Sequence, residues 1–196
     1  MWMTGTDQSS RQQLVAGAAD MIRRRGLNAT SIREVAKHAG TPLGSTYHYF
    51  PGGKHQLAAE AVRYAAGTVA SIIAAKLRAG PVEGLQAFLT LWRTVITSTD
   101  FQAGCPVLAV SIESVSIEES PAALTAAAEA FTTWSAHLAE SLREHGVAAT
   151  RAAHLATLIV AAVEGAVAMC RAQRSTDPLD QTATELTALV QAAISR

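Results

Sequence analysis

The stretch that decides the fold spans residues 30–57 and reads TSIREVAKHAGTPLGSTYHYFPGGKHQL. Ser31 and Glu34 have the spacing of a capping box, in which the Ser31 hydroxyl accepts from the Glu34 amide and the Glu34 side chain returns to the Ser31 amide. A short helix is therefore predicted to begin near Ser31. Gly40 is predicted to end it in a tight turn, because glycine enters the left-handed conformation without steric cost.

A second short helix is predicted over residues 42–49. Thr41 is expected to cap it, and Pro42 suits the first helical position because no backbone amide is needed there. Two short helices joined by a turn form a helix-turn-helix, in which the second helix enters the major groove of DNA. Its small leading residues, followed by hydroxyl and imidazole groups, suit contacts with base edges and phosphates.

The segment from Thr30 to Leu57 resembles the DNA-binding domain of TetR/AcrR-family transcriptional regulators. The resemblance rests on the order of the turn glycine, a Tyr-x-x-Phe pair and a Lys-x-x-Leu pair. Three further segments resemble the subgroup typified by LmrA and YxaF, namely Gly52-Gly53-Lys54, Gly104-Cys105-Pro106 and Glu164-Gly165-Ala166. The resemblance implies a homodimeric repressor that binds an inverted-repeat operator in double-stranded DNA. It also implies a pocket for a small effector in the C-terminal helices.

Three features depart from the family pattern. Thr41 and Pro42 stand where an apolar residue and a serine are usual, and Gly52-Gly53 adds a residue before Lys54. Thr46 replaces a usual aliphatic residue, so we expect it to weaken the packing of the second short helix. The motif survives all three changes.

The motif assigns roles to its residues. Leu43, Gly44 and Ser45 are expected to approach base edges, and Leu43 suits a thymine methyl group. Tyr47 and Tyr49 are expected to donate hydrogen bonds to phosphates. The full predicted DNA-binding set is Thr30, Ser31, Arg33, Thr41, Pro42, Leu43, Gly44, Ser45, Tyr47, His48, Tyr49 and Lys54.

The charge distribution favours a DNA-binding N-terminus. The chain has 16 basic and 16 acidic residues, but residues 1–56 hold seven Lys or Arg against three Asp or Glu. A basic head on an acidic body suits a protein that offers one end to a polyanion. We expect a DNA-binding domain over residues 1–56 and a ligand-binding and dimerisation domain over residues 57–196. The three arginines at 23–25 are better explained as favourable charges at a helix C-terminus.

Helical spacing of apolar residues extends along nearly the whole chain, and no useful segment alternates with period two. The fold is therefore predicted to be all-α, with about nine helices. Beyond the two short helices, glycine, proline and capping residues place these helices to about residue 25 and over residues 54–79, 81–98, 105–114, 121–144, 150–173 and 178–194.

The C-terminal body is acidic and apolar, with large side chains on separate helices, as in a small-molecule pocket. The predicted ligand-binding residues are Phe88, Trp92, Phe101, Cys105, Phe131, Trp134, His137 and Met169. Glu113 and Glu164 are further candidates for the pocket's few polar groups. Taken one at a time, each aromatic residue is better explained as ordinary core. A small hydrophobic or aromatic effector is expected.

The last two helices carry broad apolar faces, which either close the subunit's core or form an oligomer interface. The family resemblance favours a four-helix bundle between two subunits. The predicted interface residues are Leu155, Leu158, Ala162, Gly165, Ala166, Leu186 and Val190.

Several classes of function are disfavoured. The six histidines show no metal-binding spacing, Cys105 and Cys170 form no metal or redox motif, and no Gly-x-Ser-x-Gly or phosphate-binding loop occurs. We therefore expect no catalytic residues, no metal and no cofactor. No stretch is expected to reach the length of a membrane span, and a cytoplasmic protein is predicted. Two alternatives to a ligand-released repressor remain: a helix-turn-helix regulator that activates or answers to a protein partner, and a small helical enzyme.

Overall fold

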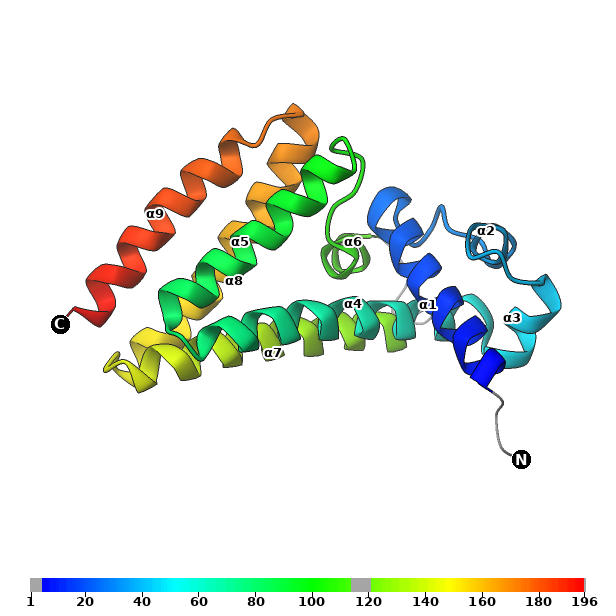
Figure 1. Ribbon diagram of the computed structural model, residues 1–196, viewed down its shortest axis with the longest axis horizontal. Coiled ribbons are helices and arrows are strands. Elements are labelled where there is room, and N and C mark those ends of the chain that lie inside the picture. The colour runs from blue at the N-terminus through cyan, green and yellow to red at the C-terminus, as the bar shows by residue number, and fades with distance from the viewer. Residues whose placement is uncertain (1–4, 114–120, 196) are drawn as a thin grey trace. The chain divides into compact units, whose positions relative to one another are not determined.

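The computed structural model describes residues 5–113 and 121–195, and within them it contains α-helices and no strand (Figure 1). The all-α prediction is confirmed. The nine described helices are α1 (Gly5–Arg25), α2 (Ile32–His38), α3 (Leu43–Tyr49), α4 (Gly53–Leu77), α5 (Pro81–Ser98), α6 (Pro106–Ile112), α7 (Pro121–Glu144), α8 (Ala149–Gln173) and α9 (Asp177–Ile194). The predicted end of the sixth helix at Ser114 and the capping residue Ser120 lie outside the described residues.

The chain forms two compact units. The first comprises Met1–Ala66 and Pro106–Glu129, and the second comprises Gly67–Cys105 and Ala130–Arg196. The first unit therefore extends past the expected boundary at residue 56 and includes α6, which packs against α1. The division into a DNA-binding and a ligand-binding domain stays a prediction.

The first unit packs α1, α2 and α3 against one another. Leu14, Ala18 and Ile22 lie on the buried face of α1, as their helical spacing predicts, and Phe50 is fully buried just after α3. The guanidinium of Arg11 lies 5.1 Å from the centre of the Phe50 ring and its tip pairs with Glu60. These contacts position α3 on the surface of the unit.

The capping box of α2 forms in part. The Ser31 hydroxyl accepts from the Glu34 amide at 3.2 Å, as predicted. The Glu34 carboxylate accepts a hydrogen bond from the Ser31 hydroxyl at 2.8 Å. This side-chain bond takes the place of the predicted bond between the Glu34 carboxylate and the Ser31 amide. The N-cap of α2 is confirmed as Ser31.

The start of α3 differs from the prediction. Pro42, with φ −61° and ψ 139°, is the N-cap, and no side chain caps the helix. The Thr41 hydroxyl instead points back to the Ala36 carbonyl at 3.5 Å, while the Thr41 amide donates to the same oxygen at 2.9 Å. Thr41 therefore closes the end of α2, and the predicted Thr41 cap of α3 is wrong.

In the second unit, α8 packs against α9 and α5, and α5 also packs against α9 (Figure 1). The largest fully buried side chains of this unit include Trp134 and Phe88. The α8 helix ends at Gln173, and its C-cap, Arg174, adopts a left-handed conformation with φ 53°. Its guanidinium donates to the Asp100 carboxylate at 2.9 Å and lies 5.7 Å from the centre of the Phe101 ring, so it holds the α5–α6 loop.

Two helices are long and apolar enough to cross a membrane by length and composition alone. They are α4 and α8, with mean hydropathies of 1.3 and 1.8 over their most apolar stretches. The expectation that no stretch would reach this level is therefore wrong. In those stretches 44% and 50% of the residues are buried inside the structure, as in the core helices of globular proteins.

Candidate nucleic-acid interface and interior polar cluster

The turn between α1 and α2 is held from three sides. The Thr30 hydroxyl is buried and donates to the Gly26 carbonyl at 2.6 Å. The Asn28 amide donates to the Glu113 carboxylate at 2.8 Å, and Lys54 Nζ donates to the Asn28 carbonyl at 3.2 Å. Thr30 and Glu113 were expected at phosphates and in a ligand pocket, respectively; both instead hold this turn in place.

Gly26 is required in this turn for two reasons. Its φ of 83° lies in the region that favours glycine, and a Cβ built there would lie 1.6 Å from Oε1 of Glu113. The residues that precede α2 are thus positioned by a carboxylate from a distant part of the sequence.

The surface of α3 is open. Tyr47 is 58% exposed, Gly44 and His48 are also exposed, and no atom lies within 4 Å of a Cβ built on Gly44. These positions are spaced three and four residues apart, so they share one face of the helix. A bare glycine next to exposed donor groups is the arrangement that lets a helix approach base edges closely.

The other predicted DNA-binding residues flank this face. Pro42, Ser31 and Arg33 are exposed, and Thr41, Leu43, Ser45, Tyr49 and Lys54 are partly exposed. The His48 and Tyr49 rings meet edge to face at 5.3 Å. All of them except the buried Thr30 therefore keep accessible surface on the first unit.

The cations of the first unit fall into paired and unpaired sets. Arg23 and Arg24 both bind Asp20, and His38 Nε2 lies 3.0 Å from the same carboxylate. Partial burial raises the pKa of Asp20, but the hydrogen bonds from the two arginines outweigh it and lower the pKa overall. Arg23 and Arg24 are thus paired within their own helix, and their role as favourable charges at the helix end stays a prediction.

Arg33 and Lys37 on α2 are exposed, and neither forms an ion pair with any residue within 5–113 and 121–195. Arg25 is bound to Glu34 at 3.3 Å, and the hydrogen bond from Ser31 is the main reason that the pKa of Glu34 is lowered. Lys37 was missed by the sequence reasoning, because its position on α2 carries no motif. Its charge is nevertheless available to a polyanion.

An aromatic cluster fills the interior of the second unit. Phe88 lies 6.3 Å from Trp92 and 6.0 Å from Trp134, and Phe131 lies 5.7 Å from Trp134, measured between ring centres. Four of the predicted ligand residues thus come together, from α5 and α7.

The remaining predicted ligand residues lie in different settings. Cys105 is buried, and His137 is half-buried on α7. Phe101 packs under the Arg174 guanidinium, and Met169 is 51% exposed on α8. Met169 therefore points away from the subunit's interior, which contradicts its placement in an enclosed pocket.

Glu164 is the most unusual polar residue of the second unit. It is 3% exposed, and neither carboxylate oxygen has a hydrogen bond of ordinary geometry among the described residues. Burial raises its pKa and a hydrogen bond from the Cys105 thiol lowers it, and the net result is a pKa of about 8. Glu164 is thus largely uncharged near neutral pH. No set of three His, Cys, Asp or Glu side chains in the described chain is placed to hold a metal.

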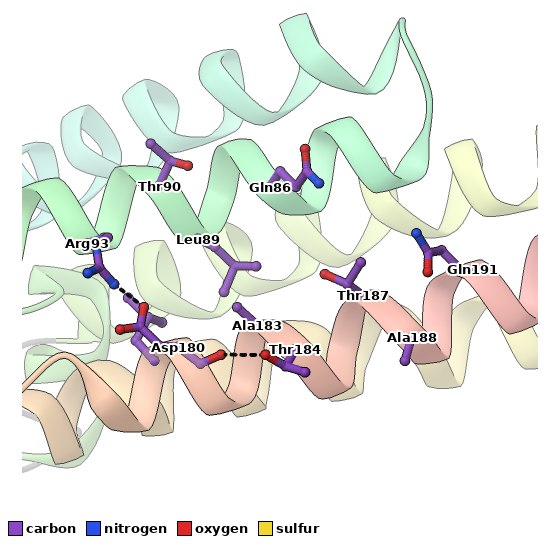
Figure 2. Close-up of a pocket in the computed structure, with 11 residues that line it drawn as sticks. Gln86, Leu89, Thr90, Arg93, Asp180, Ala183, Thr184, Thr187, Ala188 and Gln191 are labelled. Carbon is purple, nitrogen blue, oxygen red and sulfur yellow. Dashed lines mark hydrogen bonds and ion pairs between the residues drawn. The ribbon is translucent and has the colours of Figure 1, made fainter.

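A surface groove of 550 Å³ lies between α5 and α9, and Figure 2 shows Arg93 and Asp180 pairing across it. Its lining mixes polar and apolar side chains and includes none of the predicted ligand residues. Sequence reasoning missed it because the lining combines two helices far apart in the chain. The lining residues are Gln86, Leu89, Thr90, Arg93, Leu179, Asp180, Ala183, Thr184, Thr187, Ala188 and Gln191.

The predicted interface residues divide into two sets. Leu155, Ala166, Leu186 and Val190 are buried within their own subunit, so their placement on an outward face is corrected. Because α8 is apolar on nearly all sides, periodicity could not separate its inner from its outer face.

The outward face of α8 is nevertheless apolar. Leu158 is 47% exposed, Ala162 is half-buried, and Gly165 is exposed with open space around a Cβ built on it. Met169 continues this face, which is therefore the part of the predicted interface that a second subunit could reach.

The packed helices α1, α2 and α3, with α3 exposed, place the protein in the class of helix-turn-helix proteins. Comparison with known proteins makes the class specific. The profile of the tetR family of bacterial regulatory proteins matches residues 14–61, and that of the C-terminal domain of LmrA/YxaF-like transcriptional regulators matches residues 81–185. The chain belongs to the TetR family, with a C-terminal domain of the LmrA/YxaF type.

Individual relatives agree with this assignment. The chain is 42% identical to the uncharacterized HTH-type transcriptional regulator Rv0196 of Mycobacterium tuberculosis, over 88% of this chain and 90% of that protein. It is 32% identical to the HTH-type transcriptional regulator LmrA of Bacillus subtilis, over 87% and 90%. The crystal structure of regulatory protein TetR from Rhodobacter sphaeroides has the same fold, with a TM-score of 0.80, 21% identity and coverage of 91% and 97%.

The two family profiles and the sequence relatives establish a DNA-binding transcriptional regulator and not an enzyme.

Proposed function

We propose that this regulator is a homodimeric repressor that leaves an inverted-repeat operator when a small hydrophobic or aromatic effector binds in its second unit. One observation carries the proposal. The chain exposes donor groups on α3 in the first unit and encloses an aromatic cluster in the second, together with the buried carboxyl of Glu164. The first arrangement suits DNA and the second suits a small molecule.

The proposed DNA contacts divide by role. Leu43, Gly44 and Ser45 lie at the leading end of α3 and read base edges, whereas the Tyr47 hydroxyl binds a phosphate. Arg33 and Lys37 add unpaired positive charge on α2. Lys54 donates to the Asn28 carbonyl of the turn before α2, and from this position it also contacts the phosphates.

Dimerisation follows from the size of the reading helix. The seven residues of α3 reach too few base pairs for specificity, and a two-fold axis doubles the site. The outward apolar face of α8, with Leu158, Ala162, Gly165 and Met169, is the surface on which a second copy would pack. Small residues there permit close approach of two helices.

Release requires the effector to prefer the conformation that does not bind DNA, because equal affinity for both conformations shifts nothing. Helix α4 is the proposed lever, since residues from Gly53 to Ala66 belong to the first unit and residues from Gly67 to Leu77 to the second. A displacement of α4 would thus be felt in both units. A regulator of this kind works in the cytoplasm, where its DNA lies.

Fluorescence anisotropy with DNA from upstream of the gene tests the proposal. We expect saturable binding of one dimer per site, and a slope of log K against log salt near −7 if each subunit neutralises about four phosphates. Hydrophobic aromatic compounds added to the complex should release the DNA. Tight binding by a monomer, or binding that ignores salt, would contradict the DNA-binding half of the proposal.

Transcription in vitro from the same promoter decides the sign of regulation. Repression that the released protein no longer exerts is the expected result. Stimulated transcription would instead identify an activator. Release only by a cellular protein fraction would point to control by a protein partner.

A further inference from the structure

The second unit buries two polar groups that are hydrogen-bonded to no nitrogen or oxygen atom among the described residues. They are the two carboxylate oxygens of Glu164 on α8 and the indole Nε1 of Trp92 on α5, and these two helices pack together. Folded proteins leave few buried polar groups unpaired, because such groups lose their bonds to water. The pair therefore indicates a site whose partner is not part of the chain.

The surroundings of Glu164 offer its carboxyl one weak donor, the Cys105 thiol, and no cation that would stabilise a full charge. Val160, Val163 and Val167 occupy the neighbouring buried positions of α8. The thiol of Cys105 is the one titratable group that acts on the carboxyl, and within the described residues no Lys, Arg or His pairs with it. Burial consequently keeps the carboxyl uncharged near neutral pH, with a pKa of about 8.

The choice of an acid at this position narrows the chemistry of the partner. A neutral hydrogen-bond donor would be served equally well by a glutamine amide, without the cost of a group that can ionise. Only a cation makes use of the ionised form, because its charge offsets the desolvation of the carboxylate and its N–H bonds are then charge-assisted. The aromatic cluster of Phe88 and Trp134 complements an apolar body.

We propose that Glu164 anchors the effector, and that the effector is an apolar organic cation whose protonated amine donates to the Glu164 carboxylate. The inference rests on the proposed effector function of the second unit. On binding, the carboxyl loses its proton to solvent, and the ammonium keeps its own proton and forms the ion pair. Binding below pH 8 therefore releases up to one proton for each amine bound.

Isothermal titration with three matched naphthyl compounds tests this, their tails being ethylammonium, ethanol and propionate. We expect the ammonium compound to bind at least about tenfold more tightly than the other two, a difference that one charged pair readily supplies. Titration in two buffers of different ionisation heat should show a released proton. Glu164→Gln should lower the affinity for the ammonium to that for the alcohol and abolish the proton release.

Glu144→Gln is the matched control, because Glu144 is an exposed acid at the end of α7 in the same unit. It should leave every affinity unchanged. The glutamine at 164 has the shape of the acid, and circular dichroism should show that the variant folds. The inference is overturned if the ammonium does not bind, if Glu164→Gln retains its affinity, or if that variant loses the alcohol and the ammonium equally.

Operator release, measured with the same compounds, separates this inference from the proposed function. If the alcohol releases the operator and the ammonium neither binds nor acts, the role of Glu164 is wrong and effector-driven repression stands. If the ammonium binds through Glu164 and the operator stays bound, the site is right and effector-driven release is wrong.

Discussion

The exposed face of α3 and the interior around Glu164 use polar groups in opposite ways. On α3 the functional groups face solvent, and the turn before α2 is held by hydrogen bonds to Gly26, Asn28 and Glu113. Around Glu164 the polar groups are buried and unpartnered. The turn beside the DNA-binding surface is thus held by satisfied hydrogen bonds, whereas the interior of the second unit retains unsatisfied groups that lower stability until a ligand arrives.

The largest expected effect concerns the pH dependence of stability. The pKa of Glu164 is raised to about 8 in the folded protein, from its ordinary value of 4.5. The folded state therefore holds a proton that the unfolded state loses, so stability is full below about pH 4.5 and falls progressively up to pH 8. The total is up to about 4 or 5 kcal/mol, at about 1.4 kcal/mol per pH unit.

Urea unfolding of the protein and of Glu164→Gln at several pH values measures this effect. The difference between the two free energies of unfolding should change with pH in that window and level off beyond it. A constant difference would mean that Glu164 is not held uncharged in the fold.

The next prediction uses the residue beside Glu164. Gly165 faces outward on α8 with open space around it, so Gly165→Leu should leave the isolated subunit folded. If this face meets a second subunit, the added side chain costs about 1–3 kcal/mol of overpacking at each of two symmetry-related positions. Sedimentation should then show a monomer at micromolar concentration, and operator binding should fail with it. A stable dimer of the variant would place the interface elsewhere.

Gly26 and Gly40 form a matched pair that tests how firmly the α1–α2 turn is held. Both have positive φ, at 83° and 65°, but only a Cβ on Gly26 would strike Glu113. Gly40→Ala should lower the free energy of unfolding by about 1 kcal/mol, because of the backbone conformation alone. Gly26→Ala should lower it by about 2–3 kcal/mol. Thermal unfolding measures both. Adding Glu113→Ala should relieve the excess in the Gly26 variant, and equal costs without that relief would show that Glu113 does not constrain the turn.

On α3 itself, single groups should have smaller effects. Tyr47→Phe removes one exposed hydroxyl, so the affinity for specific and random duplexes should fall alike, by about 1 kcal/mol. Ser45→Ala should instead change the base preference at one position of each half-site. Anisotropy with a set of single-base variants of the operator distinguishes them. A change in base preference caused by Tyr47→Phe would reassign that residue to base reading.

The smallest effect tests whether every unpartnered buried group indicates a ligand. The Thr46 hydroxyl on α3 is fully buried and has no hydrogen-bond partner among the described residues, like the unpaired polar atoms in the second unit. It replaces a usual aliphatic residue of the family pattern. Thr46→Val should therefore stabilise the protein by about 1 kcal/mol and leave operator and effector affinity unchanged. Reduced operator affinity would show that the hydroxyl has a role on DNA.

Much of the fold could be predicted because helix ends depend on local chemistry. Gly26 ends α1, Pro81 opens α5, and Gly146 follows α7, each acting through its own backbone within one turn of helix. The one cap that was misassigned, at Thr41, failed because a neighbouring carbonyl competed for the same hydroxyl.

The candidate sites were predictable to different depths. The residues of α3 lie next to one another in the sequence, so their order alone identified them and the family. The aromatic cluster could be named only as large apolar residues on separate helices. Helix packing decided which of these residues contact one another. Met169 is also a large apolar residue at helical spacing, but it lies on the exposed surface and not in the cluster.

The sequence by itself determined the helices, the DNA-binding motif and the family, because these depend on neighbours within a few residues. Only the tertiary structure decided that Glu113 reaches the Asn28 amide across 85 residues, that Glu164 faces inward and that Gly165 faces outward. The physical reason is that burial depends on which helices pack together. When a helix such as α8 is apolar on nearly every side, its own sequence does not show which face will be buried.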